Sequence, residues 1–333
     1  MILAGDIGGT HTRLAYFKFQ DGSLKFLSES VFPSREHRGL DEIVVKFIKL
    51  HGVHPDAACF GIAGPVRNGR VETSNLPWII EGSRLSHELH LPSAFLINDV
   101  EANAWGIGAL EGKDLVTLNK VKEIPVGNQA VIAAGTGLGE AGMYWDGQKH
   151  FVFACEGGHA DFAPRNELEI DLMRYLHTRF GHVSYERIVS GPGLVNVFHF
   201  LRDTGGGEEP RWLTEEMIHG DPAAAISRAA LSRKSALAEQ ALDLWVSIYG
   251  AEAGNLALKI LATGGVYLGG GIAPKILSRL AGPLFMQAFL NKGRMQPLLE
   301  AIPVRVITND RTALLGAARC AVMKTTGLTA KKP

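Results

Sequence analysis

Gly5-Asp6-Ile7-Gly8-Gly9-Thr10 joins the first two apolar runs of the chain. Ile2 to Asp6, Thr12 to Phe19 and Leu24 to Phe32 are predicted strands, because each is apolar and bounded by turn residues. The second join, Asp21-Gly22, is also a turn signal. The chain therefore opens with three antiparallel strands, and its first glycines leave bare backbone at a strand end.

A second opening of the same kind follows later. Gly135-Thr136-Gly137-Leu138-Gly139 comes directly after the apolar run Ala130 to Ala134. Gly139 to Trp145 and Phe151 to Ala154 complete a second predicted set of three strands. Two matching openings at two matching positions indicate two related α/β lobes.

Helices and short strands alternate after each opening. The predicted helices are Gly39 to His51, Asp99 to about Leu110, Glu167 to Phe180, Gly193 to Leu201, Ala223 to Leu231, Lys234 to about Leu261, one opened by Pro274, and Thr312 to Lys324. In the longest of them, Leu237, Ala241, Leu244, Trp245 and Ile248 form one apolar stripe. The further predicted strands are Ala57 to Ile62, Ala94 to Ile97, Val266 to Leu268 and Val304 to Ile307, and Asp203 to Pro210 is a predicted surface loop.

Composition limits what the protein binds. The 333 residues include 34 Lys and Arg against 34 Asp and Glu, so the net charge is zero. A neutral chain lacks the electrostatic footprint of a nucleic-acid or anionic-membrane binder, which predicts small ligands. Cys59, Cys155 and Cys320 are too few and too scattered for disulfides or zinc, which fits a reducing cytoplasm. No apolar run is long enough to span a membrane, and no secretory signal is expected.

The glycine loops predict phosphate binding. Backbone N–H groups in such loops form anion sites, so two loops facing one cleft would hold a polyphosphate from both sides. Asp6 is a carboxylate able to organise a hydrated cation. The alternative for the first loop is a plain hairpin turn, and for Gly269-Gly270-Gly271-Ile272 a tight strand-to-helix turn rather than an adenine contact. Gly137, Gly139 and Gly142 match a dinucleotide pattern, but a strand rather than a helix follows, so the match is spurious.

Polar residues at predicted strand ends are candidates for substrate contacts. Asp99 either caps a helix or does chemistry. Glu156 and His159 place a carboxylate and an imidazole on one glycine-rich turn. Glu186 on its own would be an ordinary surface acid on a helix. Other histidines, among them His51, His54, His87 and His90, lack the paired spacing of metal ligands, so no zinc site is inferred.

These parts match the needs of phosphoryl transfer. That reaction requires cradled phosphates, a divalent ion and a carboxylate that accepts the proton of the attacking hydroxyl. A sugar acceptor also needs several polar partners for its vicinal hydroxyls once water is excluded. Asn98, Glu156, His159 and Glu186 supply that mixture.

The motifs together resemble the bacterial glucokinase family of the hexokinase/actin-like ATPase superfamily. The resemblance covers nearly the whole chain in the right order. It is carried by Gly5-Asp6-Ile7-Gly8-Gly9-Thr10, Gly61-Ile62-Ala63-Gly64-Pro65-Val66, Asn75-Leu76-Pro77-Trp78, Ile97-Asn98-Asp99, Gly135-Thr136-Gly137-Leu138-Gly139, Glu156-Gly157-Gly158-His159-Ala160-Asp161-Phe162 and Ser190-Gly191-Pro192-Gly193-Leu194.

The resemblance implies a fold and a reaction. The fold is α/β, with two ribonuclease-H-like (actin-like ATPase) lobes whose mixed sheets are flanked by helices, and with a cleft between them. The small lobe is expected at residues 1–98 plus about 305–325, and the large lobe at residues 99–304. The reaction is the ATP-dependent phosphorylation of D-glucose at its 6-hydroxyl, the entry step of glycolysis, by a cytoplasmic homodimer. Alternatives are a kinase for another hexose, or a non-catalytic sugar-sensing or actin-like protein.

The resemblance also implies residue roles. Asp99 is the general base, and Asp6 holds Mg²⁺ through water. The glucose hydroxyls are bound by Asn98, Asp99, Glu156, His159 and Glu186. ATP is bound by Gly5, Asp6, Ile7, Gly8, Gly9, Thr10, Gly135, Thr136, Gly137, Gly139, Gly270 and Gly271, with Ile272 in the adenosine contact.

Two residues depart from the family pattern. His11 stands where the family usually carries Asn, which puts an amide contact to phosphate or to the metal's water in question. Glu140 stands where the family more often has an apolar or small residue, and it is expected to point away from the nucleotide, since it would repel phosphate. No cysteines follow His159, which favours the zinc-free glucokinase branch over the related repressor and sugar-kinase group.

Overall fold

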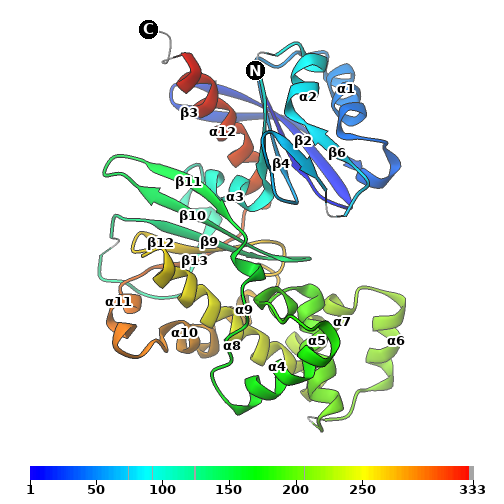
Figure 1. Cartoon of the computed structure of the whole chain (residues 1–333), viewed down its shortest axis with the longest axis vertical. Helices are drawn as coiled ribbons and strands as arrows, with labels where there is room; N and C mark the ends of the chain where they lie inside the picture. The colour runs from blue at the N-terminus through cyan, green and yellow to red at the C-terminus, as the bar shows by residue number, and fades with distance from the viewer. Residues whose placement is uncertain (74, 92, 124, 206, 330–333) are drawn as a thin grey trace. The chain divides into compact units, whose positions relative to one another are not determined.

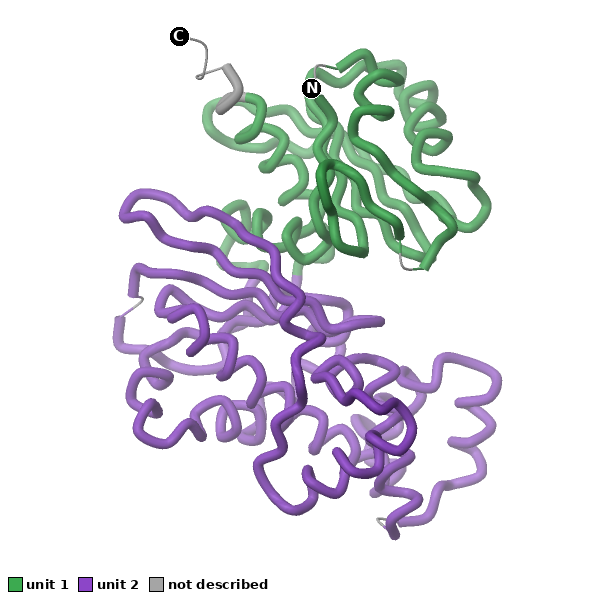
Figure 2. Tube along the Cα trace, in the orientation of Figure 1, with its two compact units in different colours: residues 1–114, 309–333 green, residues 115–308 purple. Residues whose placement is uncertain are grey.

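The computed structural model describes residues 1–329 except 74, 92, 124 and 206, and side chains to residue 325. The chain divides into two compact units (Figure 2). Unit 1 contains residues 1–114 and the chain from residue 309 on, and unit 2 contains residues 115–308. Each unit has its own sheet (Figure 1).

The sheet of unit 1 has five strands in the order β3-β2-β1-β4-β7. The strands β1 (Ile2–Ile7), β2 (His11–Gln20) and β3 (Ser23–Pro33) pair antiparallel, as the sequence predicted. The strands β4 (Ala57–Ile62) and β7 (Ala94–Asn98) continue the sheet parallel to β1. A separate hairpin, β5 (Arg70–Glu72) with β6 (Ile79–Glu81), was not predicted.

Helices cover both faces of this sheet. One face packs on α1 (Leu40–His51) and α2 (Gly82–Leu89), and the other on α3 (Asp99–Ile107) and α12 (Thr312–Thr329). The strand β1 serves both cores, because its side chains alternate between the two faces. Leu3 and Ile7 belong to the first core, and Ile2 and Ala4 belong to the second.

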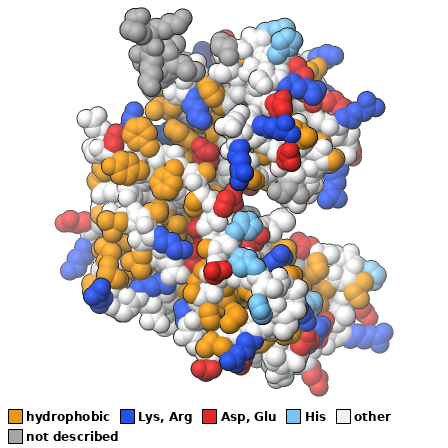
Figure 3. Space-filling model, in the orientation of Figure 1, with side chains coloured by type: hydrophobic (Ala, Val, Ile, Leu, Met, Phe, Trp, Pro, Cys, Tyr) orange, Lys and Arg blue, Asp and Glu red, His pale blue; other side chains and the backbone are white. Residues whose placement is uncertain are grey.

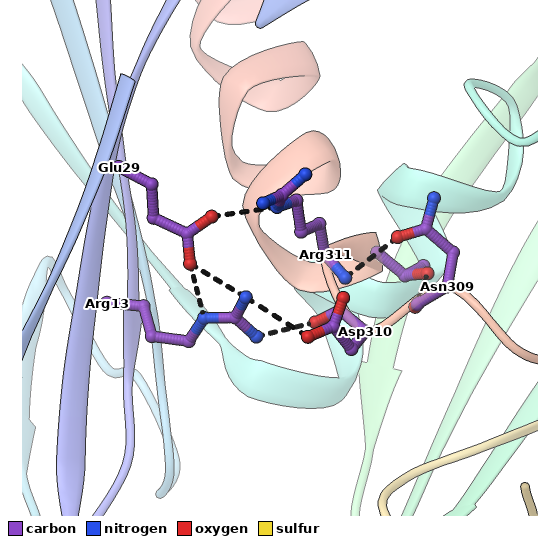
Figure 4. A network of polar contacts seen from close by, with 6 residues as sticks. Arg13, Glu29, Asn309, Asp310 and Arg311 are labelled. Carbon is purple, nitrogen blue, oxygen red and sulfur yellow. Dashed lines mark hydrogen bonds and ion pairs between the residues drawn. The ribbon is translucent and has the colours of Figure 1, made fainter. Parts of the chain in front are cut away.

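An ion-pair network ties the start of α12 to the sheet of unit 1 (Figure 4). Arg13 on β2 pairs with Glu29 on β3 at 2.7 Å and donates to the Asp310 carbonyl at 2.8 Å. Arg311 donates to Glu29 Oε2 at 2.7 Å. Two arginines therefore share one half-buried glutamate, which fixes where the chain re-enters unit 1.

The division between the units differs from the one expected at residue 98. The helix α3 belongs to unit 1, because small residues let it pack closely against α12. A Cβ at Gly106 would collide with the Thr312 backbone, and a Cβ at Gly316 would collide with the Ala102 carbonyl. Asp99 therefore stays with the strand that precedes it.

The sheet of unit 2 has six strands in the order β11-β10-β9-β12-β13-β8. The three-strand opening of β9 (Gln129–Ala134), β10 (Leu138–Trp145) and β11 (His150–Cys155) is antiparallel, as predicted. The strands β12 (Gly265–Gly269) and β13 (Val304–Ile307) run parallel to β9, and β8 (Leu115–Thr117) is an unpredicted antiparallel edge. Since Gly142 lies inside β10, rejection of the dinucleotide pattern is confirmed.

The helices of unit 2 include several that the periodicity predicted. These are α4 (Glu167–Phe180), α5 (Gly191–Asp203), α7 (Pro222–Leu231) and α8 (Ala236–Lys259). The helices α6 (Arg211–His219), α10 (Pro283–Leu290) and α11 (Gln296–Glu300) were not predicted. The predicted helix at Pro274 is wrong: the chain turns there, with Gly270 at φ +79°, and α9 (Leu277–Leu280) begins later.

The helix α8 is the centre of the unit 2 core. It is buried on nearly all sides rather than on the one predicted stripe, as expected of a helix that is apolar all round. Trp245 donates its indole N–H to the Ser190 carbonyl at 3.1 Å, and Tyr249 donates to the Ile132 carbonyl at 3.1 Å. Each large ring thus has its polar atom satisfied inside the core.

The close packing of α3 on α12 gives the first prediction. We expect Gly316→Ala to lower the free energy of unfolding by about 1–3 kcal/mol, because the new Cβ meets backbone that must shift. This loss outweighs the gain of about 1 kcal/mol in helix propensity. Denaturant titration measures it, with Gly112→Ala, whose Cβ would point into open space, as the control. Equal stability of the two variants would contradict the packing argument.

Candidate active site

The first group of candidate residues lies at one edge of the unit 1 sheet. Because β1, β4 and β7 are parallel, their carboxyl ends meet at this edge, where ligands bind in open α/β sheets. Ile7 pairs with Ile62, and Ile62 pairs with Asn98, so the three strands end level with one another. Asp6, Asn98 and Asp99 are therefore brought to the same edge by strand register alone.

The first glycine loop is held by buried hydroxyl groups. The Gly8 N–H donates to the His11 carbonyl at 3.0 Å. Ser34 donates to the Gly8 carbonyl at 2.8 Å, and its hydroxyl is 3.0 Å from that of the buried Thr12. The turn that carries Gly9 and Thr10 is thus fixed before any ligand arrives.

Not all of the predicted loop residues belong to that turn. Gly5 and Ile7 lie inside β1, where Gly5 is buried against Phe60 and Ile7 is a core residue. Gly8, Gly9 and Thr10 form the turn itself, and the exposed His11 begins β2. Gly9 is required because a Cβ there would collide with Asn75.

Asp6 is the electrostatically strained group of this edge. Burial, the nearby Asp99 carboxylate and Glu29 raise its pKa to about 6, while Arg13 opposes the rise. Two carboxylates thus share an environment that penalises negative charge. Such a pair favours the approach of a cation.

The structure identifies the cap of α3 as Asn98, not Asp99. The Asn98 side chain accepts from Val100 N at 2.8 Å and Glu101 N at 3.3 Å, and Glu101 bonds back to the Asn98 N–H. This is a complete capping box. The capping interpretation of Asp99 is therefore wrong, and Asp99 is the first residue of the helix.

The second glycine loop, in unit 2, is held by Glu186. The Leu138 N–H donates to Glu186 Oε2 at 2.9 Å, and a Cβ at Gly137 would meet the same carboxylate oxygen 2.5 Å away. Gly191 N–H donates to the Gly135 carbonyl at 2.8 Å. Glu186 lies in a 3₁₀ turn, half-buried, so it is not an ordinary surface acid on a helix.

The turn of Glu156 and His159 lies beside Glu186. Gly157–His159 is a 3₁₀ turn, and His159 Nδ1 is 3.9 Å from Glu186 Oε1. Backbone hydrogen bonds from Tyr185 N to the Ala160 carbonyl (3.1 Å) and from Phe162 N to the Val183 carbonyl (2.9 Å) fix the two segments together. Unit 2 therefore brings Glu156, His159 and Glu186, 30 residues apart in sequence, to one place, with Glu156 and His159 exposed.

A cavity of about 790 Å³ opens next to the second glycine loop. This volume lies in the usual range of small-molecule sites. Of the predicted nucleotide contacts, Gly135, Thr136, Gly271 and Ile272 line it, and Gly137, Gly139 and Gly270 do not. Gly270 supports the wall instead, since its positive φ and its closeness to the Ala134 backbone both require glycine.

Sequence reasoning missed much of the cavity wall. The start of α5 had a signal, because its Ser190-Gly191-Pro192 run was a recognised motif without an assigned role. The start of α7 and the exposed Lys275 had none. The missed lining residues include Gly191, Pro192, Asn196, His199, Asp221, Pro222 and Lys275.

Glu140 does not line this cavity. Its side chain is only 2% exposed and lies against Gly157 and Glu252. The acid that departs from the family pattern at this position is therefore buried inside unit 2.

The donor groups fit a water-held Mg²⁺ rather than an all-protein metal cage. Among the described residues, no three His, Cys, Asp or Glu side chains are placed to hold a metal ion together. Mg²⁺ typically keeps several waters and takes one or two carboxylates together with substrate phosphates. Asp6, with its raised pKa, is a carboxylate suited to that role.

Comparison with solved structures gives the class of protein. A glucokinase from an Antarctic psychrotroph superposes with a TM-score of 0.84 at 30% identity, covering 97% of this chain and 98% of that one. A ROK family glucokinase from Streptomyces griseus, solved with glucose and AMPPNP, superposes with a TM-score of 0.63 at 20% identity over 97% and 99% of the two chains. The fold is that of the actin-like ATPase sugar kinases, as the resemblance implied.

Sequence comparison then gives the family. The Glucokinase family profile matches residues 3–324. A glucokinase of Nostoc sp. is 44% identical over 337 aligned residues, which cover 96% of this chain and 98% of that protein. The chain belongs to the glucokinase family. In the part of the chain that the structure describes, no helix is long and apolar enough to cross a membrane.

The raised pKa of Asp6 predicts a pH-dependent stability difference. Protonated Asp6 contributes to the free energy of unfolding fully below about pH 4. This contribution is lost as the pH rises through about 6, because Asp6 ionises at lower pH in the unfolded chain than in the folded one. We therefore expect the free energy of unfolding of Asp6→Asn at pH 7.5 to exceed that of the wild type by about 1–3 kcal/mol. Denaturant titration measures the difference. The gain should shrink below pH 4.5. A gain that is independent of pH would contradict the assignment.

Proposed function

We propose that this chain transfers the γ-phosphoryl group of ATP to the 6-hydroxyl of D-glucose and forms glucose 6-phosphate. The observation that carries the proposal is Asp99, the first residue of α3, at the sheet edge that also holds Asp6. Membership of the glucokinase family supports glucose as the acceptor. In the cell the reaction would be the entry step of glycolysis.

Asp99 is the proposed general base. A carboxylate that accepts the proton of the 6-hydroxyl as the bond to phosphorus forms contributes about 10²–10⁴ in rate. The capping of α3 by Asn98 leaves the Asp99 side chain in the first turn of the helix. Val100 N donates to Asp99 Oδ1 at 3.0 Å and so limits the orientations of the carboxylate.

The other glucose hydroxyls are assigned to Asn98, Glu156, His159 and Glu186. Glu186 has one oxygen engaged by the Leu138 N–H, so the same carboxylate would hold the second glycine loop and face the sugar. Such a shared group would couple the placement of the acceptor to the placement of the phosphates.

ATP is assigned to the glycine loops and to the cavity of unit 2. The S. griseus kinase was solved with AMPPNP, an ATP analogue, which supports ATP as the donor. Backbone N–H groups at Gly9 and Gly137 would donate to phosphate oxygens, while those of Gly8 and Gly135 hold the loops by donating to the His11 and Gly137 carbonyls. Gly271 and Ile272 would contact the adenosine part.

Mg²⁺ is assigned to Asp6 through water. Held there, the ion would supply positive charge that offsets the negative charge of the phosphates. Asp6 would orient the metal's waters, and Arg13 would keep Asp6 ionised, since its charge lowers the pKa of that carboxyl.

A cytoplasmic homodimer is proposed for the assembly. The edge strand β11 carries exposed Phe151 and Phe153, with exposed Tyr144 beside it on β10. Hydrophobic side chains gather on the face of unit 2 that carries these strands (Figure 3). An apolar edge strand of this kind is suited to a second copy. Sedimentation velocity distinguishes a dimer from a monomer.

Asp99→Asn tests the central assignment. We expect kcat to fall by about 10²–10⁴ while the Kd for glucose stays within about tenfold, because the amide keeps the shape but accepts no proton. A coupled assay for ADP release and calorimetry with glucose measure the two quantities. Asp171→Asn, an exposed acid on α4, is the matched control. Ordinary turnover by Asp99→Asn would refute the general base, and turnover with another hexose alone would refute glucose.

Removal of the metal tests the role of Asp6. We expect a chelator to abolish turnover and added Mg²⁺ to restore it. In Asp6→Asn the Mg²⁺ concentration for half-maximal rate should rise by about tenfold or more, since a neutral amide orders the hydrated ion poorly. The KM for glucose at saturating Mg²⁺ serves as the internal control. An unchanged Mg²⁺ dependence would remove Asp6 from the metal site.

A further inference from the structure

Glu140 is a buried acid with one unpartnered carboxyl oxygen. It lies on β10, opposite Ile132 of β9 and Cys155 of β11, and its side chain is 2% exposed. Its Oε1 accepts no hydrogen bond from any N–H or O–H group of the described residues. A buried carboxylate left without donors costs more than any other common side chain, so the group requires an explanation.

The Glu140 carboxyl group supports the turn that carries Glu156 and His159. A Cβ at Gly157, the first residue of that 3₁₀ turn, would collide with Glu140 Oε2. A Cβ at Gly158 would collide with the Leu138 carbonyl. The two glycines therefore let the turn rest directly on β10, and the atom beneath Gly157 is a carboxyl oxygen.

The other neighbour of Glu140 is a second buried acid, Glu252 of α8. The two carboxyl groups are within hydrogen-bonding reach, and Glu252 is completely buried. Glu252 already accepts from Asn255 Nδ2 at 2.8 Å and from Lys259 Nζ at 3.2 Å. Lys259 therefore balances the charge of Glu252. Lys292 also lies near Glu252, but its ammonium group donates to the Ala251 carbonyl and to Asn255 Oδ1.

Two buried carboxyl groups within hydrogen-bonding reach hold one proton between them, because like charges in contact cannot both ionise. Burial, followed by the charge of Glu252, raises the pKa of Glu140 to about 8, and Lys259 opposes the rise. Glu140 is thus the protonated partner near neutral pH. The titratable and charged groups that interact with one or the other carboxyl group are Lys259, Lys292, Tyr185, Tyr249 and Cys155.

We propose that Glu140 is a positioning residue for the sugar site: in its protonated form it donates to Glu252 and supports Gly157, which sets the turn that presents Glu156 and His159 to glucose. This inference rests on the proposed function for the identity of the sugar. When the proton is lost to solvent at alkaline pH, Glu140 is repelled by Glu252, and the turn is displaced. Glucose binding then weakens, while the nucleotide cavity, which Glu140 does not line, is unaffected.

Glucose binding measured against pH tests the proposal. Calorimetry on the full chain without nucleotide should show the Kd for glucose rising about tenfold from pH 7 to pH 9, since about one tenth of Glu140 keeps its proton one unit above its pKa. The Kd for ADP should stay constant over the same range. Glu140→Gln, which keeps the shape and an N–H donor to Glu252, should bind glucose at pH 7 as the wild type does and show no alkaline loss. Glu300→Gln, an exposed acid of α11, should behave as the wild type.

Lys292 is the competing explanation for an alkaline transition. Burial lowers its pKa to about 8, and it donates to the Ala251 carbonyl at 3.0 Å next to Glu252. Glu140→Gln leaves Lys292 in place, so an alkaline loss that survives in this variant overturns the proposal. A flat wild-type profile, or an equal loss of ADP binding, also overturns it.

A spectroscopic measurement covers the case in which Glu140→Gln folds poorly. The infrared difference spectrum of the wild type between pH 7 and pH 9 should lose a carboxylic-acid carbonyl band, and Glu252→Gln should shift the pH of that loss. Absence of the band at pH 7 overturns the proposal. The kinase activity and the positioning role of Glu140 can be refuted separately. Glucose binding that depends on pH, without any turnover, refutes the kinase activity but not the positioning role. Glucose binding that does not depend on pH, with normal turnover, refutes the positioning role but not the kinase activity.

Discussion

Parallel pairing of β1, β4 and β7 is the constraint on which the unit 1 site depends. Parallel strands have their carboxyl ends at one edge of the sheet. Residues 6 and 99, more than 90 positions apart in sequence, are therefore brought close together by strand pairing alone. The pairing needs helices on both faces, and α12 returns from the far end of the chain to cover one of them. The network of Arg13, Glu29 and Arg311 fixes that return against β2 and β3 (Figure 4).

The candidate residues of unit 2 are positioned differently from those of unit 1, because they lie on turns rather than at strand ends. Glu186 holds the glycine loop through the Leu138 N–H, and backbone hydrogen bonds tie its segment to the turn of His159. Behind that turn lies the Glu140–Glu252 pair, whose cost in burial is partly offset by Lys259. Buried polar groups thus support the polar residues of the site. A core that contains such groups is less stable than a purely apolar core.

The sequence predicted most strands and the longer helices, because their periodicity and glycine punctuation are local properties. It failed where tertiary contacts override local signals. The turn after β12 has Pro274, a good helix opener, yet Ile272 N–H bonds to the Ala134 carbonyl and the chain stays in a turn. At the start of α3 the sequence offered Asp99 as a possible cap, whereas the hydrogen bonds of the structure assign the cap to Asn98.

The sequence by itself determined the two sheet openings, the family and the residue types of the site, since these reside in motifs and in the spacing of apolar residues. The tertiary structure decided three further things: which lobe α3 joins, which residues of α5 and α7 line the cavity, and that Glu140 is buried on a second acid. Each of these depends on atoms that meet across long separations in sequence, such as Gly316 with Ala102 or Glu140 with Glu252. No local pattern encodes such meetings, because they arise only when helices and sheets pack.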